Sequence, residues 1–193
     1  MIAMARKYEF KPDKPYSGLV EKLLLTKKQQ RSVLKWALYA LVLVALSVLQ
    51  DVLLSRVRLF GATTELVPCG IVLICILEGV ERGSVFTLIA SFLYLFSGSA
   101  AGVYSPVLLT VLTVLVVVFR HAYVQSGFAA AMLCTGIVLF GYKMLEFLIG
   151  VFLELTTFPQ VGSFLITAAL TLIAAPVIYP VLCAIGGGDI WKE

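Results

Sequence analysis

The sequence has few charged residues for its length. Only 13% of its 193 residues are Asp, Glu, Lys or Arg, whereas about a quarter are charged in typical soluble domains. Hydrophobic residues make up 61% of the chain, and its mean hydropathy is +1.02. A chain of this size has too much surface for its volume to hide so much apolar area from water. The composition excludes a soluble globular domain and predicts an integral membrane protein.

The apolar runs also lack the alternation of polar and apolar residues that an outer-membrane β-barrel requires. We therefore expect an all-α membrane protein with six transmembrane helices. Several helices should be short: residues 85–96 would span roughly 18 Å, against about 30 Å of hydrocarbon core. Local thinning of the bilayer and packing against neighbours would accommodate such helices. The six runs are 33–54, 66–77, 85–96, 104–119, 128–155 and 163–185.

Residues that commonly perform catalysis or bind metals are scarce. The chain has a single histidine, His121, and four cysteines in apolar runs without Cys-x-x-Cys spacing. A metal site needs several such ligands at suitable spacing, so we expect neither a metal nor another cofactor. The sequence also contains no nucleophile elbow, phosphate-binding glycine loop or Walker sequence. These absences favour a protein that is not an enzyme.

Positive charge is concentrated at the N-terminus. This predicts a basic cytoplasmic tail over residues 1–32, a membrane domain over 33–185 and a short cytoplasmic tail over 186–193. With both termini inside, twelve basic residues lie on the cytoplasmic side and two outside. Anionic lipid is the expected contact of the basic tail; nucleic acid is disfavoured because the tail adjoins a membrane span. Nine of the 15 basic residues lie in the first 35: Arg6, Lys7, Lys11, Lys14, Lys22, Lys27, Lys28, Arg31 and Lys35.

Three ionisable residues interrupt the fifth apolar run. On a helix, Lys143, Glu146 and Glu154 would lie within roughly an 80° arc of one face. Because ionisable groups in lipid are costly, this face should point into the bundle or at a partner. A proton or substrate relay is one interpretation. An internal Lys143–Glu146 ion pair, with Glu154 near the outer surface, is favoured because a single stripe without opposed partners makes a poor pathway.

Glycine and proline mark two further features. Gly98 and Gly102 lie between the third and fourth runs, where small residues should shape a helical hairpin rather than a dimer contact. Pro176 and Pro180 lie one turn apart around Tyr179, so the last helix should kink there.

The order of these features resembles the rod shape-determining MreD family over residues 33–185. The residues that carry the resemblance are Gln50 at the end of the first helix, Glu65 opening the second in ATTEL, and the third segment from Gly83 to the SGSAAG hairpin. PVIYP in the last helix completes the pattern. Tyr94 stands where that family often has an aspartate before the hairpin, and Thr64–Glu65 where it often has Pro-Asp, as in a divergent member.

The resemblance implies a non-catalytic subunit of the bacterial cell-elongation machinery for peptidoglycan synthesis, located in the cytoplasmic membrane. Its expected partners are an MreC-type bitopic protein and, through it, a RodA-type glycosyltransferase with its penicillin-binding partner; actin-like MreB filaments are a further candidate. An apolar face of the third and fourth segments would bind the partner's helix. The family is similar in fold to the substrate-binding subunits of energy-coupling-factor (ECF) transporters.

That similarity supplies the alternative, a vitamin-binding transporter subunit. Candidate ligand-pocket residues would then be Glu65, Tyr104 and Glu154. The alanines of the first run lack the Ala-x-x-x-Ala spacing typical of such subunits. A secondary transporter is a third interpretation, but the two halves of the sequence show no apparent repeat.

Overall fold

The computed structural model describes residues 27–52, 54, 62–98, 100, 102–123 and 127–186. The chain divides into two compact units, residues 1–34 and 35–193. Of the first unit, only the beginning of the first helix is described. The predicted basic tail up to residue 26 and the C-terminal residues 187–193 lie outside the described residues.

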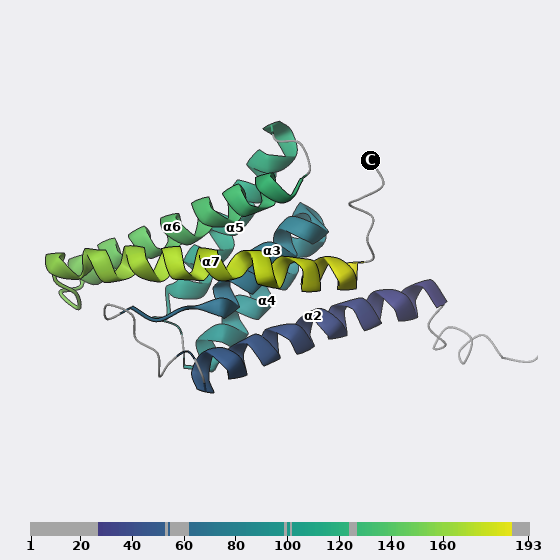
Figure 1. The fold of residues 1–193 in the computed structure, drawn as a ribbon, viewed down its shortest axis with the longest axis horizontal. Helices are drawn as coiled ribbons and strands as arrows, with labels where there is room; N and C mark the ends of the chain where they lie inside the picture. The colour runs from purple at the N-terminus through teal and green to yellow at the C-terminus, as the bar shows by residue number, and fades with distance from the viewer. Residues whose placement is uncertain are drawn as a thin grey trace, which may run out of the picture. The chain divides into compact units, whose positions relative to one another are not determined.

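The described residues form six α-helices and no β-strand, which confirms the all-α prediction (Figure 1). Four helices are long and apolar enough to cross a membrane: Ser32–Val52, Ser105–Ala122, Phe128–Phe152 and the stretch Phe158–Gly186. This supports a membrane protein. The helices are α2 (Lys27–Val52), α3 (Leu66–Glu78), α4 (Val80–Phe96), α5 (Ser105–Tyr123), α6 (Phe128–Phe152) and α7 (Val161–Gly186), with a short 3-10 turn, η2 (Phe158–Gln160), before α7.

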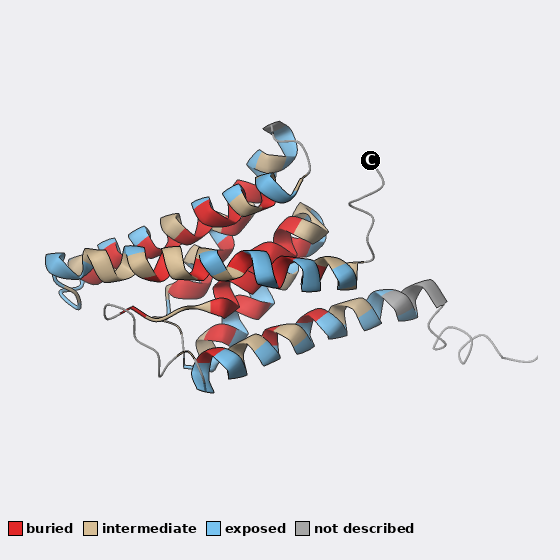
Figure 2. Ribbon diagram, in the orientation of Figure 1, coloured by how far each residue is buried: buried red, intermediate tan, exposed pale blue. Residues whose placement is uncertain are grey.

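Helix α3 is the centre of the second unit. Its sequence contains no charged residue before its last position, Glu78, and every residue from Leu66 to Ile76 is buried (Figure 2). Helices α4, α5, α6 and α7 all pack against it. Because α3 has only 13 residues, it is about 20 Å long, shorter than the hydrocarbon core. It is a central helix enclosed by protein on its sides.

Helices α3 and α4 are joined by one glycine, Gly79, and approach each other closely at another, Gly83. Gly79 joins them with φ of 82°, a conformation that glycine adopts without strain. One turn later, a Cβ atom on Gly83 would lie 2.9 Å from both the Cα and the carbonyl oxygen of Cys75. Only glycine fits at this contact between the two backbones.

A tight turn connects α4 to α5 at the expected small residues. Gly98 has φ of 76°, and its N–H donates to the Leu95 carbonyl at 3.1 Å, which ends α4. A Cβ on Gly102 would lie 2.7 Å from the Cε1 atom of Tyr104, so a larger residue would displace that ring. The two glycines thus let α5 fold back along α4.

Helix α7 runs through both of its prolines. Pro176 and Pro180 are exposed on its surface, whereas Tyr179 between them is buried and packs edge-on against Phe128 at 5.1 Å between ring centroids. Each proline removes one backbone donor and leaves a carbonyl one turn earlier without its usual partner. The predicted kink at these residues stays a prediction.

Candidate functional site

The candidate site lies at the N-terminus of α3. Two residues of this site come from the middle of other helices. Lys143 is nine residues before the end of α6, and Thr171 is ten residues after the start of α7. At 1.5 Å per residue, these positions are roughly 14–15 Å from the ends of their helices. Because both residues contact Glu65, which immediately precedes α3, that helix begins well inside the bundle rather than at its surface.

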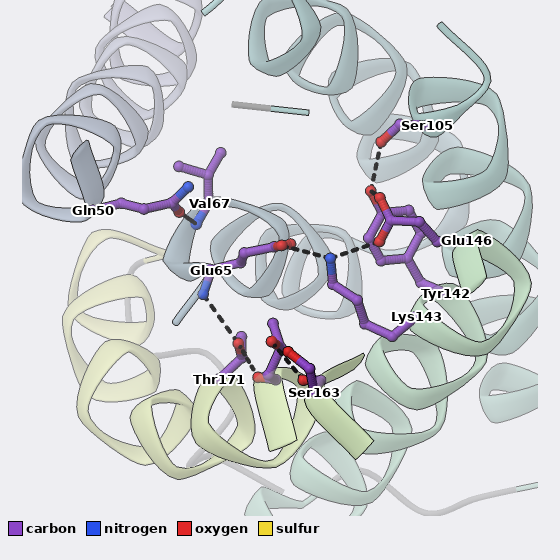
Figure 3. A network of polar contacts seen from close by, with 10 residues as sticks. Gln50, Glu65, Val67, Ser105, Tyr142, Lys143, Glu146, Ser163 and Thr171 are labelled. Carbon is purple, nitrogen blue, oxygen red and sulfur yellow. Dashed lines mark hydrogen bonds and ion pairs between the residues drawn. The ribbon is translucent and has the colours of Figure 1, made fainter. Parts of the chain in front are cut away.

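Side chains from two other helices bind the first N–H groups of α3. The first N–H groups of any helix have no acceptor within the helix. Here the Glu65 N–H donates to Thr171 Oγ1 at 3.1 Å, and the Val67 N–H donates to Gln50 Oε1 at 3.2 Å (Figure 3). Gln50 belongs to α2 and Thr171 to α7, so these bonds fix the start of α3 against both helices.

An ionic cluster of three residues occupies the same place. The Lys143 ammonium lies 2.5 Å from Glu65 Oε1 and 2.6 Å from Glu146 Oε2 (Figure 3). The side chains of Lys143 and Glu146 are 7% and 2% exposed, and that of Glu65 is 18% exposed. Glu65 Oε2 is buried and has no hydrogen-bond partner among the described residues. The cluster therefore contains two carboxylates for one ammonium.

Further hydroxyl groups extend this cluster into a network. Tyr142 makes a long contact of 3.5 Å with Glu146 Oε1, and the Ser105 and Tyr142 hydroxyls are hydrogen-bonded at 2.5 Å. Tyr94, buried on α4, is hydrogen-bonded to Gln50. Helices α2, α4, α5, α6 and α7 each contribute a side chain, and α3 contributes the backbone N–H of Val67 beside its N-cap residue Glu65. The network is the polar junction of the helix bundle.

The sequence predicted the Lys143–Glu146 pair and an exposed Glu154, but the prediction that Glu154 continues the same helix face was wrong. The pair is present, as the i, i+3 spacing indicated. However, α6 ends at Phe152, and Glu154 follows with φ of 59° and an exposed side chain. Because the chain leaves the helix before Glu154, this residue does not share the buried face of Lys143. The residue that contacts Lys143 from another part of the bundle is Glu65. The two residues are 78 positions apart in the sequence, so helix periodicity could not predict their contact.

The network does not reach the other end of α3. Beyond it, the α3 side chains Val72, Leu73, Ile74, Cys75 and Ile76 are apolar and no more than 3% exposed. Arg120 contacts α3 only at the far end, donating to the Ile76 carbonyl at 2.9 Å. A relay needs polar groups along its whole length. This arrangement holds helices together, and the α3 side chains beyond it supply no polar groups for a relay.

Metal binding has no support in the described part of the chain. No group of three His, Cys, Asp or Glu side chains there is placed to hold an ion. The three α3 and α6 cysteines Cys69, Cys75 and Cys134 are buried, and His121 is exposed at the end of α5.

An apolar groove lies beside the network, between α2, α3 and α4. Its volume is about 350 Å³, and Tyr94 contributes to both the groove and the network. Small residues line both walls, with Ala40 and Ser47 on α2 and Ala90 on α4. The groove is lined by Ala40, Leu43, Val44, Ser47, Val48, Val67, Phe86, Ile89, Ala90, Leu93, Tyr94 and Ser97.

Comparison with protein-family models, with curated proteins and with solved structures gives no match to this chain. The resemblances to the MreD family and to the ECF substrate-binding fold therefore stay predictions.

Proposed function

We propose that this protein is a non-catalytic membrane subunit that binds the single transmembrane helix of a partner. In its specific form, following the resemblance stated above, it is a scaffold of the bacterial cell-elongation complex in the cytoplasmic membrane. Its direct partner is an MreC-type protein, which connects it to a RodA-type glycosyltransferase, the penicillin-binding partner and MreB filaments. All six helices cross or enter the membrane, and both termini are cytoplasmic.

The groove between α2 and α4 is the observation that carries this proposal. In lipid, helices associate through close packing, and small residues let two backbones approach. The groove offers Ala40 and Ser47 on one wall and Ala90 on the other, among exposed apolar side chains such as Val48 and Ile89. The surface expected from sequence lay on α4 and α5. The groove instead lies between α4 and α2.

A pull-down of the tagged protein from its own membranes in mild detergent, followed by mass spectrometry, tests the partners. We expect the MreC-type protein and the RodA-type synthase. Recovery of an ATPase pair with a coupling membrane subunit instead would overturn the scaffold proposal and favour an ECF-type vitamin-binding subunit. The buried, unpartnered Glu65 Oε2 favours that alternative, since a bound ligand could donate to it.

Photo-crosslinking tests the groove itself. A benzophenone amino acid replacing Ile89 in the groove should capture the partner's helix. The same probe replacing Ile173 on α7, which is 72% exposed and does not line the groove, is the matched lipid-facing control. Equal capture from both positions, or capture from Ile173 alone, would contradict the assignment of the groove.

A further inference from the structure

A second pocket lies at the opposite end of α3 from the ionic network. It has a volume of about 340 Å³ and is bounded by the α3–α4 turn and the end of α5. Small-molecule pockets in proteins measure about 300–1,000 Å³, so this pocket suits a small group. Its lining residues are Ile76, Leu77, Glu78, Gly79, Val80, Val117, Arg120 and His121.

The guanidinium of Arg120, which lines this pocket, has only some of its N–H groups hydrogen-bonded. Arg120 donates through Nη1 to the Ile76 carbonyl at 2.9 Å, which fixes the guanidinium at the pocket wall. Its Nε is buried and has no hydrogen-bond partner among the described residues. A buried N–H donor without an acceptor is costly, and a guanidinium binds phosphate oxygens through adjacent N–H groups. Exposed His121 lies beside it in the same lining.

The negative charge in the pocket is already neutralised. Glu78 is the acidic residue of the lining, and its Oε1 accepts from the Lys35 ammonium at 2.6 Å and from the Tyr39 hydroxyl at 2.7 Å. The charged side chains of the adjoining first turn of α4, Glu81 and Arg82, are exposed and of opposite sign. An incoming anion therefore meets Arg120 without an unpaired carboxylate in the lining.

The backbone adds to this preference. Helix α4 begins at Val80, and its first intrahelical bond runs from the Gly83 N–H to the Gly79 carbonyl at 2.9 Å. The N–H groups of Val80, Glu81 and Arg82 have no acceptor within α4, whereas the Gly79 N–H donates to the Cys75 carbonyl at 3.0 Å. Such a helix N-terminus favours anions. Gly79 and Val80 both line the pocket.

We propose that this pocket binds a phosphate group, either the headgroup of an anionic phospholipid or a soluble phosphate. The Arg120 guanidinium and the start of α4 bind the phosphate oxygens, and exposed His121 lines the same pocket. This site is separate from the groove, so it does not depend on the partner proposed above.

Native mass spectrometry of the full-length, delipidated protein in detergent tests this proposal. Phosphatidylglycerol should be retained at least tenfold more tightly than diacylglycerol with the same acyl chains. If millimolar inorganic phosphate displaces phosphatidylglycerol, the site takes soluble phosphate as well; if not, it is specific for the lipid. Equal retention of the two lipids would overturn the proposal.

Three variants separate the pocket from general surface charge. Arg120→Gln and Val80→Glu should each weaken phosphatidylglycerol binding about tenfold, by losing a charge-assisted bond or by adding a like charge. Arg82→Gln, at an exposed position on the same turn, should change it less than about twofold. Val80→Glu leaves the hydrogen bond between Arg120 and the Ile76 carbonyl intact. If Arg120→Gln unfolds, the affinity of Val80→Glu for phosphatidylglycerol therefore tests the proposal by itself. Equal effects of Val80→Glu and Arg82→Gln would refute a specific site.

Discussion

Lys143 lies between two carboxylates, those of buried Glu146 on its own helix and of partly buried Glu65 just before α3. Replacing it with methionine would leave Glu65 and Glu146 close together without a counter-charge. Removing one partner of a buried ion pair costs about 3–5 kcal/mol, because the remaining charge is desolvated and unpaired. We expect Lys143→Met to lower the free energy of unfolding by about that amount, measured by denaturant titration in detergent with circular dichroism.

Glu154→Gln is the matched control, because Glu154 is exposed beyond the end of α6. It should change the unfolding free energy by less than about 0.5 kcal/mol. The triple variant Glu65→Gln, Lys143→Met and Glu146→Gln should recover most of the stability lost in Lys143→Met. A Lys143→Met protein as stable as the parent would show that the ionic cluster is not a structural junction.

At the scale of the element, α3 depends on acceptors that other helices supply. Thr171→Val keeps the shape of the side chain but removes the acceptor of the Glu65 N–H, 106 residues away in the chain. A buried N–H left without an acceptor costs about 1–3 kcal/mol. We expect this loss in the unfolding free energy, together with faster amide hydrogen exchange at the first residues of α3.

Thr110→Val supplies the comparison for that experiment. The Thr110 hydroxyl is also buried, but it bonds to the Pro106 carbonyl of its own helix, whose position does not depend on it. Its loss should leave exchange in α3 unchanged. Similar exchange in the two variants would mean that Thr171 does not anchor α3.

The contact between α3 and α4 predicts opposite effects for two glycines. Gly83→Ala would place a methyl group 2.9 Å from the Cys75 backbone, which cannot move without shifting α3. Such overpacking costs about 1–3 kcal/mol. A Cβ on Gly162, in the first turn of α7, meets nothing within 4 Å, so Gly162→Ala should be neutral or stabilising by up to about 1 kcal/mol. Thermal unfolding of both variants in one detergent measures the difference.

The helices themselves could be predicted from sequence because each contains one long apolar run, although Lys143 and Glu146 interrupt the run of α6. The Lys143–Glu146 pair was also predictable, since i, i+3 contacts follow from helix geometry alone. The partnership with Glu65 and the cap from Gln50 were not, because they depend on how separate helices pack. The helix was predicted to run past Glu154 because two apolar residues, Leu153 and Leu155, continue the apolar run after α6 has ended at Phe152. One local feature of the sequence indicated a helix that begins inside the bundle. This feature is the short apolar run 66–77, which directly follows Glu65.

For the whole molecule, the positions of charge predict orientation in the membrane. The end that holds Lys35, Arg82 and Arg120 should face the cytoplasm, and the α4–α5 turn should face outward. A cysteine replacing exposed Ser97 should react with a membrane-impermeant maleimide in intact cells, whereas one replacing exposed Arg82 should react only after permeabilisation. Cysteine-free protein provides the background. The reverse labelling pattern would invert the proposed topology.

The burial of α3 has a consequence for how the protein is made. The ribosome synthesises Glu65 and α3 early, but the groups that satisfy them, Lys143 and Thr171, emerge 78 and 106 residues later. Until then, the short helix would bring a carboxylate and bare N–H groups into lipid without partners. Helix α3 should therefore enter the membrane late, or wait beside the insertion machinery until α6 and α7 arrive. Chains truncated before α6 should be recognised as incomplete and degraded.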